Sequence, residues 1–299
     1  MFDLVRTLDC AGRPLRLDQP RIAAIVNVTP DSFSDGGRFA NPQQAIDHGV
    51  RLVEEGADMI DVGGESTRPG ADEISADEEI ARIVPVIEGL VARISIPIAI
   101  DTSKPEVMRA AVAAGAGLIN DVYALRREGA LDAAAAAKVP VCLMHMQGEP
   151  RTMQANPHYD DVVSDVRRFL AERIFACEMS GIDKKRIVVD PGFGFGKTLE
   201  DNLALLRALD QFAALGVPLL VGLSRKGMIG TLTGRDVGQR AAGSAAAAMI
   251  AVQKGAAIVR VHDVAETRDA LAVWRGVSTG AKPASKAQKP FGSQRFEDD

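Results

Sequence analysis

Residues 96–120 read IPIAIDTSKPEVMRAAVAAGAGLIN and contain one complete strand–helix–strand unit. Ile96–Asp101 is a short apolar run of strand length that ends on a polar residue. Lys104–Gly115 then repeats apolar residues at helical spacing and ends at a glycine, and Gly117–Asn120 begins the next apolar run. Such a unit predicts two parallel strands joined by a helix.

The same alternation extends in both directions along the chain and gives eight units. The predicted strands are Ile22–Val28, Met59–Val62, Ile96–Asp101, Gly117–Asn120, Val139–His145, Arg186–Asp190, Pro218–Gly222 and Ala257–Val261. The predicted helices are Pro42–Gly56, Ala76–Ile94, Lys104–Gly115, Gly129–Lys138, Tyr159–Gly181, Leu199–Leu209, Gly238–Gly255 and Val264–Arg275.

Eight such units predict the α/β class and a single (β/α)8 TIM barrel of parallel strands, because each right-handed crossover places the next strand beside the last. An open doubly wound sheet is the alternative. Polar residues follow every predicted strand rather than one switch point, and the patterned region has the usual length of about 250 residues, so we favour closure. We expect residues 1–20 to be an N-terminal lead-in segment, residues 21–276 to be the barrel, and residues 277–299 to be a disordered tail.

Composition excludes several classes of protein. The net charge is −5 and Lys184–Arg186 is the only tight basic run of the folded region, so we expect no nucleic-acid partner. Met1–Arg13 lacks a signal-peptide core and Ala241–Val252 is too short to span a bilayer, which predicts no membrane partner. The three cysteines are far apart and favour neither disulfides nor a zinc site, so we expect a soluble, cytoplasmic protein.

Polar or ionisable side chains follow all eight predicted strands. One Asp after a strand is more often the N-cap of the next helix than a catalyst, and Asp61 and Asp101 can each be explained in that way. Caps do not require Lys, Arg and His, so the whole set indicates a ligand site at the C-terminal ends of the strands. Its mixture of carboxylates, carboxamides and cations suits a ligand with a polar heteroaromatic head and an anionic tail. The set is Asn27, Asp61, Asp101, Asn120, His145, Asp190, Lys226, and Arg260 with His262.

Two long motifs carry a resemblance to a known family. Asn27–Gly37 reads NVTPDSFSDGG and Asp61–Gly70 reads DVGGESTRPG, and both resemble signatures of the dihydropteroate synthases. Six shorter stretches occur in the family's order, so that the resemblance covers about residues 20–275 of the chain. They are DTSKP (Asp101–Pro105), IND (Ile119–Asp121), MHMQG (Met144–Gly148), DPGFGFGK (Asp190–Lys197), SRK (Ser224–Lys226) and RVHD (Arg260–Asp263).

The resemblance implies a transferase of folate biosynthesis. Such an enzyme transfers the 6-hydroxymethyl-7,8-dihydropterin group from its pyrophosphate to p-aminobenzoate, and so releases pyrophosphate and forms 7,8-dihydropteroate. It implies Mg²⁺ as the cofactor, with Asn27 as the protein's metal ligand, and a homodimer formed through helices late in the barrel. It also implies that sulfonamides compete for the p-aminobenzoate pocket, because Phe33–Gly37 and Ser66–Gly70 carry no insertion relative to the family's ordinary pattern.

The resemblance further implies which residues meet each part of the substrates. A carboxylate can accept both donors of the pterin edge, and a guanidinium can stack on the ring face; Met144 would also suit an ordinary core position. The implied pterin contacts are Asp101, Asn120, Met144, Asp190, Lys226 and Arg260. The implied pyrophosphate contacts are Asn27, Thr67, Arg68, Arg260 and His262. The implied p-aminobenzoate contacts are Phe33, Thr67, Pro69, Phe195 and Ser224. Lys226, Arg260 and Asp101 are the implied catalytic residues.

Three other interpretations compete with this one. Gly196-Lys197-Thr198 resembles the end of a nucleotide-binding P-loop, but the first glycine of that motif is replaced by Pro191. A pterin-binding methyltransferase barrel would need no pyrophosphate site, so Asn27–Gly37 and Asp61–Gly70 count against it. A non-catalytic paralogue should have lost anion-binding residues that this chain retains.

Overall fold

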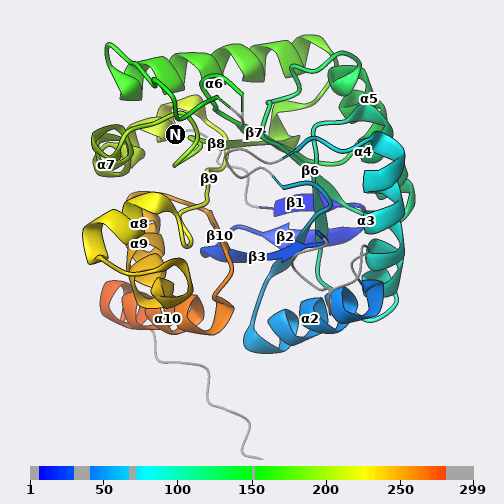
Figure 1. The fold of residues 1–299 in the computed structure, drawn as a ribbon, viewed down its shortest axis with the longest axis horizontal. Helices are drawn as coiled ribbons and strands as arrows, with labels where there is room; N and C mark the ends of the chain where they lie inside the picture. Colours follow the sequence, from blue (N-terminus) through cyan, green and yellow to red (C-terminus); the bar gives the residue numbers. More distant parts are fainter. Residues whose placement is uncertain (1–6, 30–40, 67–71, 150–151, 281–299) are drawn as a thin grey trace, which may run out of the picture.

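A computed structural model describes residues 7–29, 41–66, 72–149 and 152–280 of the 299-residue chain, and within these ranges the predicted barrel is present (Figure 1). Its parallel strands are β3 (Arg21–Asn27), β4 (Met59–Gly63), β5 (Ile98–Asp101), β6 (Leu118–Asp121), β7 (Val141–Met144), β8 (Ile187–Asp190), β9 (Leu220–Val221) and β10 (Ile258–Val261). They pair in the order β8-β7-β6-β5-β4-β3-β10-β9. A parallel bridge between Val189 and Leu219 joins the two ends of this order, so the sheet closes on itself.

The helices surround the strands and follow them in sequence (Figure 1). They are α2 (Pro42–Glu55), α3 (Ala76–Val91), α4 (Pro105–Ala113), α5 (Ala130–Ala137), α6 (Val162–Met179), α7 (Leu199–Arg207), α8 (Gly227–Thr233), α9 (Ala241–Gln253) and α10 (Val264–Thr279). Short 3₁₀ turns lie at Lys184–Arg186, Leu209–Leu215 and Val237–Gln239. The sequence prediction missed α8, which directly follows the residues after β9.

Strand residues alternate between two cores. Outward-facing residues such as Ile60, Ile98 and Val141 pack against the helices in the largest buried cluster. The intervening residues point into the barrel, where each of the eight strands contributes one buried side chain to a second cluster. These inward residues are Ala23, Met59, Ala99, Leu118, Cys142, Val188, Leu220 and Ile258.

An N-terminal hairpin closes the lower end of the barrel, at the start of the strands. β1 (Thr7–Cys10) pairs antiparallel with β2 (Arg13–Arg16), and the turn residues Ala11 and Gly12 both have positive φ, as a tight two-residue hairpin requires. Leu8, Cys10 and Leu15 are buried against the inward strand residues. The predicted lead-in segment therefore contains a packed structural element, which its two short strands of mixed polar and apolar residues did not indicate.

Glycine at position 117 is required by the close approach of this hairpin. A Cβ on Gly117 would lie 2.4 Å from the carbonyl oxygen of Cys10, closer than packed atoms can come. Arg13 fastens the same hairpin to the end of α3, because its guanidinium donates to the carbonyls of Val91, Ile94 and Ile96, each at 3.0 Å.

The C-terminal boundary also differs from the prediction. Helix α10 continues to Thr279, so it includes the first three residues of the segment predicted to be disordered. The remaining residues of that segment, from 281 on, lie outside the described part of the chain. No helix of the described residues is long and apolar enough to cross a membrane.

Leu8→Ala tests the contribution of the hairpin to stability. Leu8 is fully buried, so its truncation should lower the free energy of unfolding by about 2–4 kcal/mol through lost burial and a residual cavity. Leu232→Ala is the matched control, because Leu232 is 56% exposed and should change stability by less than about 0.5 kcal/mol. Urea denaturation measures both, and equal midpoints for the two variants would contradict a packed hairpin.

Candidate active site

A second layer of inward-facing side chains lies directly above the apolar one. Inward positions recur every second residue along a strand. The residue two positions after each inward apolar residue therefore also points into the barrel, whether it is the last residue of the strand or lies just beyond it. Five of the eight are polar, and all five come from different strands. The layer consists of Ile25, Asp61, Asp101, Asn120, Met144, Asp190, Gly222 and Arg260.

Arg260 is the centre of a buried polar network in this layer. Its Nε donates to Asp61 Oδ2, and one of its Nη atoms donates to Asp101 Oδ2 at 2.6 Å. Asn120 Nδ2 donates to the same oxygen of Asp61 at 3.2 Å. A side chain from β4 therefore orients side chains from β6 and β10, and one guanidinium faces two carboxylates.

The charges of this network are not fully compensated. Burial raises the pKa of Asp101 to about 7; the guanidinium of Arg260 opposes this shift and Asp61 adds to it. Burial disfavours the charged form of Arg260, yet Asp61 and Asp101 together raise its pKa above the ordinary value. Among the described residues, Asp61 Oδ1 is buried with no hydrogen-bond partner. The network thus retains acceptor capacity for a ligand that carries N–H donors.

Asp190 at the end of β8 lies near Lys226, which follows β9. Asp190 Oδ1 accepts from the backbone N–H of Gly192 at 2.7 Å, and burial raises the pKa of this carboxyl while the charge of Lys226 opposes the shift. Lys226 Nζ donates to the carbonyl of Phe193 and lies 4.4 Å from the centre of the Phe195 ring. Burial lowers the pKa of Lys226 to about 8, and nearby Arg260 adds to this shift.

Methionines form an apolar wall beside these charges. Met144, Met146 and Met153 are buried together in a small cluster, and Phe195 packs against it. Polarizable, unbranched side chains of this kind adapt well to a flat aromatic ring. The cluster includes the predicted pterin contact and the predicted ring contact for p-aminobenzoate.

The strand ends above this layer present Asn27, Ser224 and His262. Ser224 Oγ accepts from the backbone N–H of His262 at 3.1 Å and lies 3.0 Å from its Nδ1. A residue predicted to contact p-aminobenzoate is therefore bonded to one predicted to bind pyrophosphate. At the end of β3, a Cβ on Gly63 would lie 3.6 Å from Asn27 Oδ1, so the glycine of β4 leaves space beside this carboxamide.

The turn that carries Ser224 and Lys226 is held by its middle residue. Arg225 has a positive φ of 57°, and its N–H donates to Ser244 Oγ at 2.9 Å. Its guanidinium forms a two-point pair with Asp263, with Nε at 3.0 Å from Oδ2. The pair ties the end of β9 to the end of β10, and so positions the two flanking site residues.

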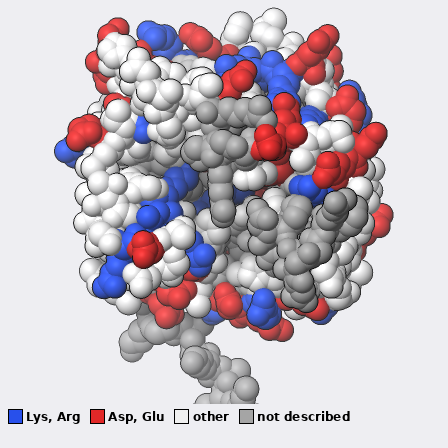
Figure 2. Space-filling view, viewed as in Figure 1, with Lys and Arg blue, Asp and Glu red and all other residues white. Residues whose placement is uncertain are grey.

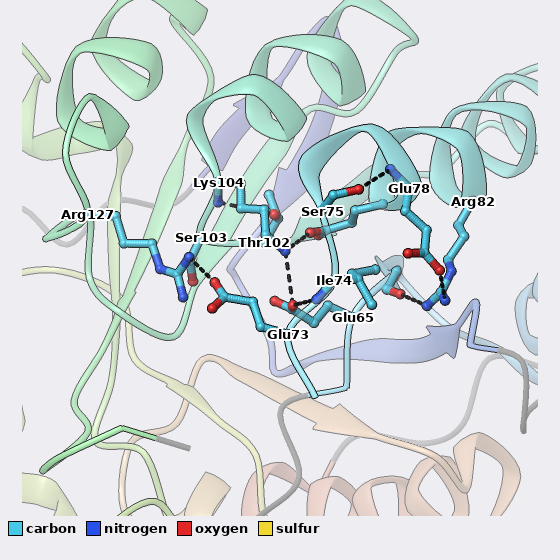
Figure 3. A network of polar contacts seen from close by, with 12 residues as sticks. Glu65, Glu73, Ile74, Ser75, Glu78, Arg82, Thr102, Ser103, Lys104 and Arg127 are labelled. Atoms are coloured by element: carbon cyan, nitrogen blue, oxygen red, sulfur yellow. Dashed lines mark hydrogen bonds and ion pairs between the residues drawn. The ribbon is translucent and has the colours of Figure 1, made fainter. Parts of the chain in front are cut away.

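A buried charge cluster holds the chain on both sides of residues 67–71 (Figure 3). Glu65 Oε1 accepts from the backbone N–H of Ile74 at 2.9 Å and from Lys104 Nζ at 3.0 Å. Lys104 also pairs with the fully buried Glu79 at 2.6 Å. Burial raises the pKa of Glu79, and the hydrogen bond and charge of Lys104 oppose this shift.

Two arginines add to this cluster, one from α3 and one from the connection between β6 and α5. Arg82 donates to the carbonyl of Gly64 at 2.9 Å, and Arg127 pairs with Glu73 at 2.6 Å (Figure 3). Both ends of the segment are therefore fixed against the barrel. Four predicted contacts lie outside the described residues, and their placement stays a prediction: Phe33, Thr67, Arg68 and Pro69.

The motif that resembles the end of a P-loop has a structural role here. Lys197 is buried, and its Nζ donates to the carbonyls of Gly192 at 2.8 Å and Phe195 at 3.0 Å. Thr198 caps α7 through a reciprocal capping box with Asp201. The lysine turns into its own loop, so it does not offer its ammonium group to a nucleotide.

The outer surface on the side seen in Figure 2 carries both signs of charge, with Lys and Arg gathered over the region of α8 and α9 beside the central hollow. An anionic ligand at the strand ends would approach this basic margin.

Known proteins are similar to this chain in sequence and in fold. A family model described as pterin binding enzyme matches residues 23–262. The dihydropteroate synthase of Haemophilus influenzae is 52% identical over 264 residues, which cover 88% of this chain and 96% of that protein. The chain belongs to the dihydropteroate synthase family.

Solved dihydropteroate synthases superpose closely on the barrel. The enzyme of Xanthomonas albilineans with 4-aminobenzoic acid has a TM-score of 0.87 at 61% identity, over 93% of this chain and 99% of that one. The enzyme of that organism was also solved with 7,8-dihydropteroate. The enzyme of Yersinia pestis in a sulfonamide complex has a TM-score of 0.87 at 47% identity, over 92% and 100% of the chains. As a dihydropteroate synthase, the chain is a transferase of folate biosynthesis on a TIM barrel.

Two buried charged residues near the strand ends were not among the predicted contacts. Asp61 was noted at a strand end, where a helix cap explained it equally well, and Lys197 was noted only as part of a misleading motif. For Asp61 the signal that could have been used is the alternation of inward and outward positions along β4. Asp61 lies two residues after the inward Met59, as Asp101 lies two after Ala99, so alternation alone places both carboxylates inside the barrel.

Asp61→Asn tests the orienting role of this carboxylate. Asn keeps one acceptor oxygen but carries no charge and adds an NH₂ donor, so Arg260 loses its ion pair with residue 61 and the shared acceptor is weakened; kcat/KM for dihydropteroate formation should fall by roughly 10- to 100-fold. Asp58→Asn is the control, because it breaks an Arg–Asp pair with Arg21 at the opposite end of the same strand. Steady-state kinetics on both variants decide the matter. Wild-type kcat/KM in a folded Asp61→Asn protein would refute the role.

Proposed function

We propose that the strand-end residues of this barrel bind the pterin pyrophosphate and p-aminobenzoate, and that they work with Mg²⁺. The inward layer and Lys226, just beyond β9, carry this proposal: together they bring three carboxylates, one carboxamide and two cations to one end of the barrel. The reaction needs such a mixture, because one substrate has a donor-rich ring at one end and pyrophosphate at the other.

The pterin ring suits the buried carboxylates. Its amino group and ring N–H form a pair of donors, which Asp190 can accept with both oxygens at the cost of its present bond to Gly192. Asn120 offers a donor and an acceptor, and Asp101 accepts a further N–H. Lys226 would exchange the carbonyl of Phe193 for an acceptor on the ring. Met144 lies beside these groups as an apolar contact for the ring face.

The pyrophosphate end is proposed to lie above the pterin, at Asn27, Arg260 and His262, together with Thr67 and Arg68 of the undescribed segment. The described residues contain no cluster of three His, Cys, Asp or Glu side chains that could hold a metal. Mg²⁺ commonly binds through substrate phosphates and water with one or two protein oxygens. The carboxamide oxygen of Asn27 is a suitable protein ligand for a Mg²⁺ ion whose other ligands would be pyrophosphate oxygens and water. Such an ion would neutralise charge on the leaving group.

The chemical step is a substitution at the pterin methylene. The bond from this carbon to the pyrophosphate oxygen breaks, a bond to the aniline nitrogen forms, and that nitrogen gives up one proton. No protein nucleophile is required. Arg260 and Lys226 stabilise the developing charges, Asp101 fixes the ring through its N–H, and the barrel orients both substrates and excludes water.

The second substrate is proposed to lie between Phe195 and Ser224, with Phe33, Thr67 and Pro69 completing its pocket. Phe195 has an apolar environment of methionines, and Ser224 supplies a hydroxyl near Lys226. Sulfonamides carry the same aniline, so we propose that they compete with p-aminobenzoate here, as the sulfonamide complex of the Yersinia pestis enzyme suggests. A cytoplasmic location is part of the same proposal, because the three buried cysteines are free thiols, as is usual in a reducing compartment.

The activity assay supplies the test of the metal. Purified protein should release pyrophosphate and form dihydropteroate with both substrates and Mg²⁺, and EDTA should stop turnover until Mg²⁺ is restored in excess. Asn27→Ala should raise the Mg²⁺ concentration needed for half-maximal rate by about tenfold, since one ligand is lost. Asn41→Ala, which removes the cap of α2, is the matched control and should leave this requirement unchanged. Full turnover in EDTA, or none with all three components, would exclude the proposed reaction scheme.

A homodimer is also proposed, formed by the outer faces of α9 and α10. Helix α9 exposes Ala242, Ala246 and Ile250 at four-residue spacing, and α10 exposes Val273 and Val277 in the same way. The two helices pack side by side, so these small and apolar side chains form one flat surface suited to a second copy.

The double variant Val273→Asp/Val277→Asp should be monomeric, because two carboxylates would be buried without partners in the interface. Phe175→Asp is the control, since Phe175 is equally exposed but lies on α6, on the opposite side of the barrel (Figure 1). Light scattering at micromolar concentration measures the mass. A monomeric wild-type protein would remove the proposal.

A further inference from the structure

The loop between β8 and α7 presents five successive carbonyl groups that all accept hydrogen bonds from side chains. The four donors come from three segments of the chain: Gln154 and Tyr159 from the connection between β7 and α6, Lys197 from the end of the loop itself, and Lys226 from the residues after β9. The bonds run from Lys197 to Gly192 (2.8 Å) and Phe195 (3.0 Å), from Gln154 to Gly194 (2.6 Å), from Tyr159 to Gly196 (2.7 Å), and from Lys226 to Phe193. Main-chain polar groups in loops are ordinarily left to water, so this loop is held in one shape by its neighbours.

Close approach of the backbone requires glycine in the same loop. A Cβ on Gly192 would lie 1.9 Å from the carbonyl oxygen of His145, and one on Gly196 would lie 2.4 Å from that of Gln147. Both glycines have positive φ, which other residues rarely adopt. The loop is therefore pressed against the residues that follow β7, and its carbonyls are turned toward the side chains that hold them.

Lys197 is the central donor of this arrangement. Its side chain is 3% exposed, and Nζ also lies 3.0 Å from His145 Nδ1. No carboxylate among the described residues forms an ion pair with it. Burial lowers the pKa of Lys197 to about 7, and burial likewise lowers the pKa of His145 to about 2, so the imidazole is neutral and can accept. Burying an ammonium group without a carboxylate partner costs free energy, and the hydrogen bonds from Lys197 to backbone carbonyls offset part of that cost.

The opposite side of the loop faces the site. The carbonyl of Phe195 is bonded to Lys197, while its ring packs against the methionine cluster and lies beneath Lys226. A displacement of the loop would therefore move the Phe195 ring and the Phe193 carbonyl to which Lys226 donates. Asp190 should move less when the loop is displaced, because β8 is paired in the sheet up to that residue.

We propose that Lys197 is a positioning residue for the second substrate: its buried ammonium group holds the loop 192–196 in the shape that places Phe195 against p-aminobenzoate. The proposal rests on the proposed contact of Phe195 with that substrate. It differs from a purely structural role in one respect, because it makes the affinity for p-aminobenzoate and its mimics depend on Lys197 more than the affinity for the pterin does.

Lys197→Met keeps the stem of the side chain and removes every donor. At saturating pterin pyrophosphate, KM for p-aminobenzoate and Ki for sulfanilamide should rise together by about tenfold or more, because small displacements of a contact are costly. Pterin affinity, measured by calorimetry, should change by less than about threefold, since Asp190 and Asn120 remain in the sheet. Tyr159→Phe is the matched control: it removes one neutral donor to the next carbonyl and should change all three values by less than about threefold.

The outcomes separate this proposal from the assignment of Phe195. Phe195→Ala that leaves KM for p-aminobenzoate unchanged, beside a Lys197→Met that raises it, would remove the Phe195 contact and overturn the proposal, because Lys197 would then act on this substrate by another route. Phe195→Ala that raises KM, beside a Lys197→Met with wild-type KM and Ki, would overturn the proposal. Equal losses of pterin and p-aminobenzoate affinity would overturn it too. If Lys197→Met does not fold, Lys197→Gln, which keeps two N–H donors on a shorter side chain, is measured against the same criteria.

Discussion

The strict two-residue alternation of the barrel strands is the constraint on which the rest of the molecule depends. It sends every second side chain inward, so one register defines a complete layer around the barrel. The lower layer is apolar and is closed by the hairpin through Leu8 and Leu15. The layer above it is polar. Ligand groups can therefore bind on a dry, rigid base without water reaching them from below.

Charge is arranged in that upper layer so that it is nearly but not fully balanced. Its three carboxylates face Arg260 of the same layer and Lys226 just beyond β9, and burial raises the pKa of two of them, Asp101 and Asp190. Asp61 and Asp101 share Arg260, which leaves acceptor capacity on the β4 side of the site. A ligand that brings N–H donors relieves this imbalance, whereas a ligand that places a carboxylate at the same position would worsen it. The uncompensated acceptors of this layer thus favour a donor-rich head group before any contact with an anionic tail is considered.

Much of this could be predicted from the sequence, because strand periodicity and polar strand ends are local features. The eight strands and the inward placement of Asp101, Asn120 and Asp190 follow from them. The hairpin could not be found in this way, since two four-residue strands in a charged segment carry too little pattern. Asp61 was left open because a helix cap also explains an Asp after a strand. The role of Lys197 depends on where its ammonium group points, and a Gly-Lys-Thr motif does not encode that.

The loop after β8 shows how a reaction without a protein nucleophile can still depend on distant residues. When catalysis rests on placing two substrates and a leaving group, the walls must keep their shape while charges move. Backbone dipoles that are already bonded cannot reorient toward the developing charge, and Lys197, Gln154 and Tyr159 bond those of the Phe195 wall from outside the pocket. Lys226 is the exception, because its bond to Phe193 is the one that a ligand acceptor can replace. If the proposed substrate contacts hold, the loop combines a fixed surface for p-aminobenzoate with a releasable cation for the pterin.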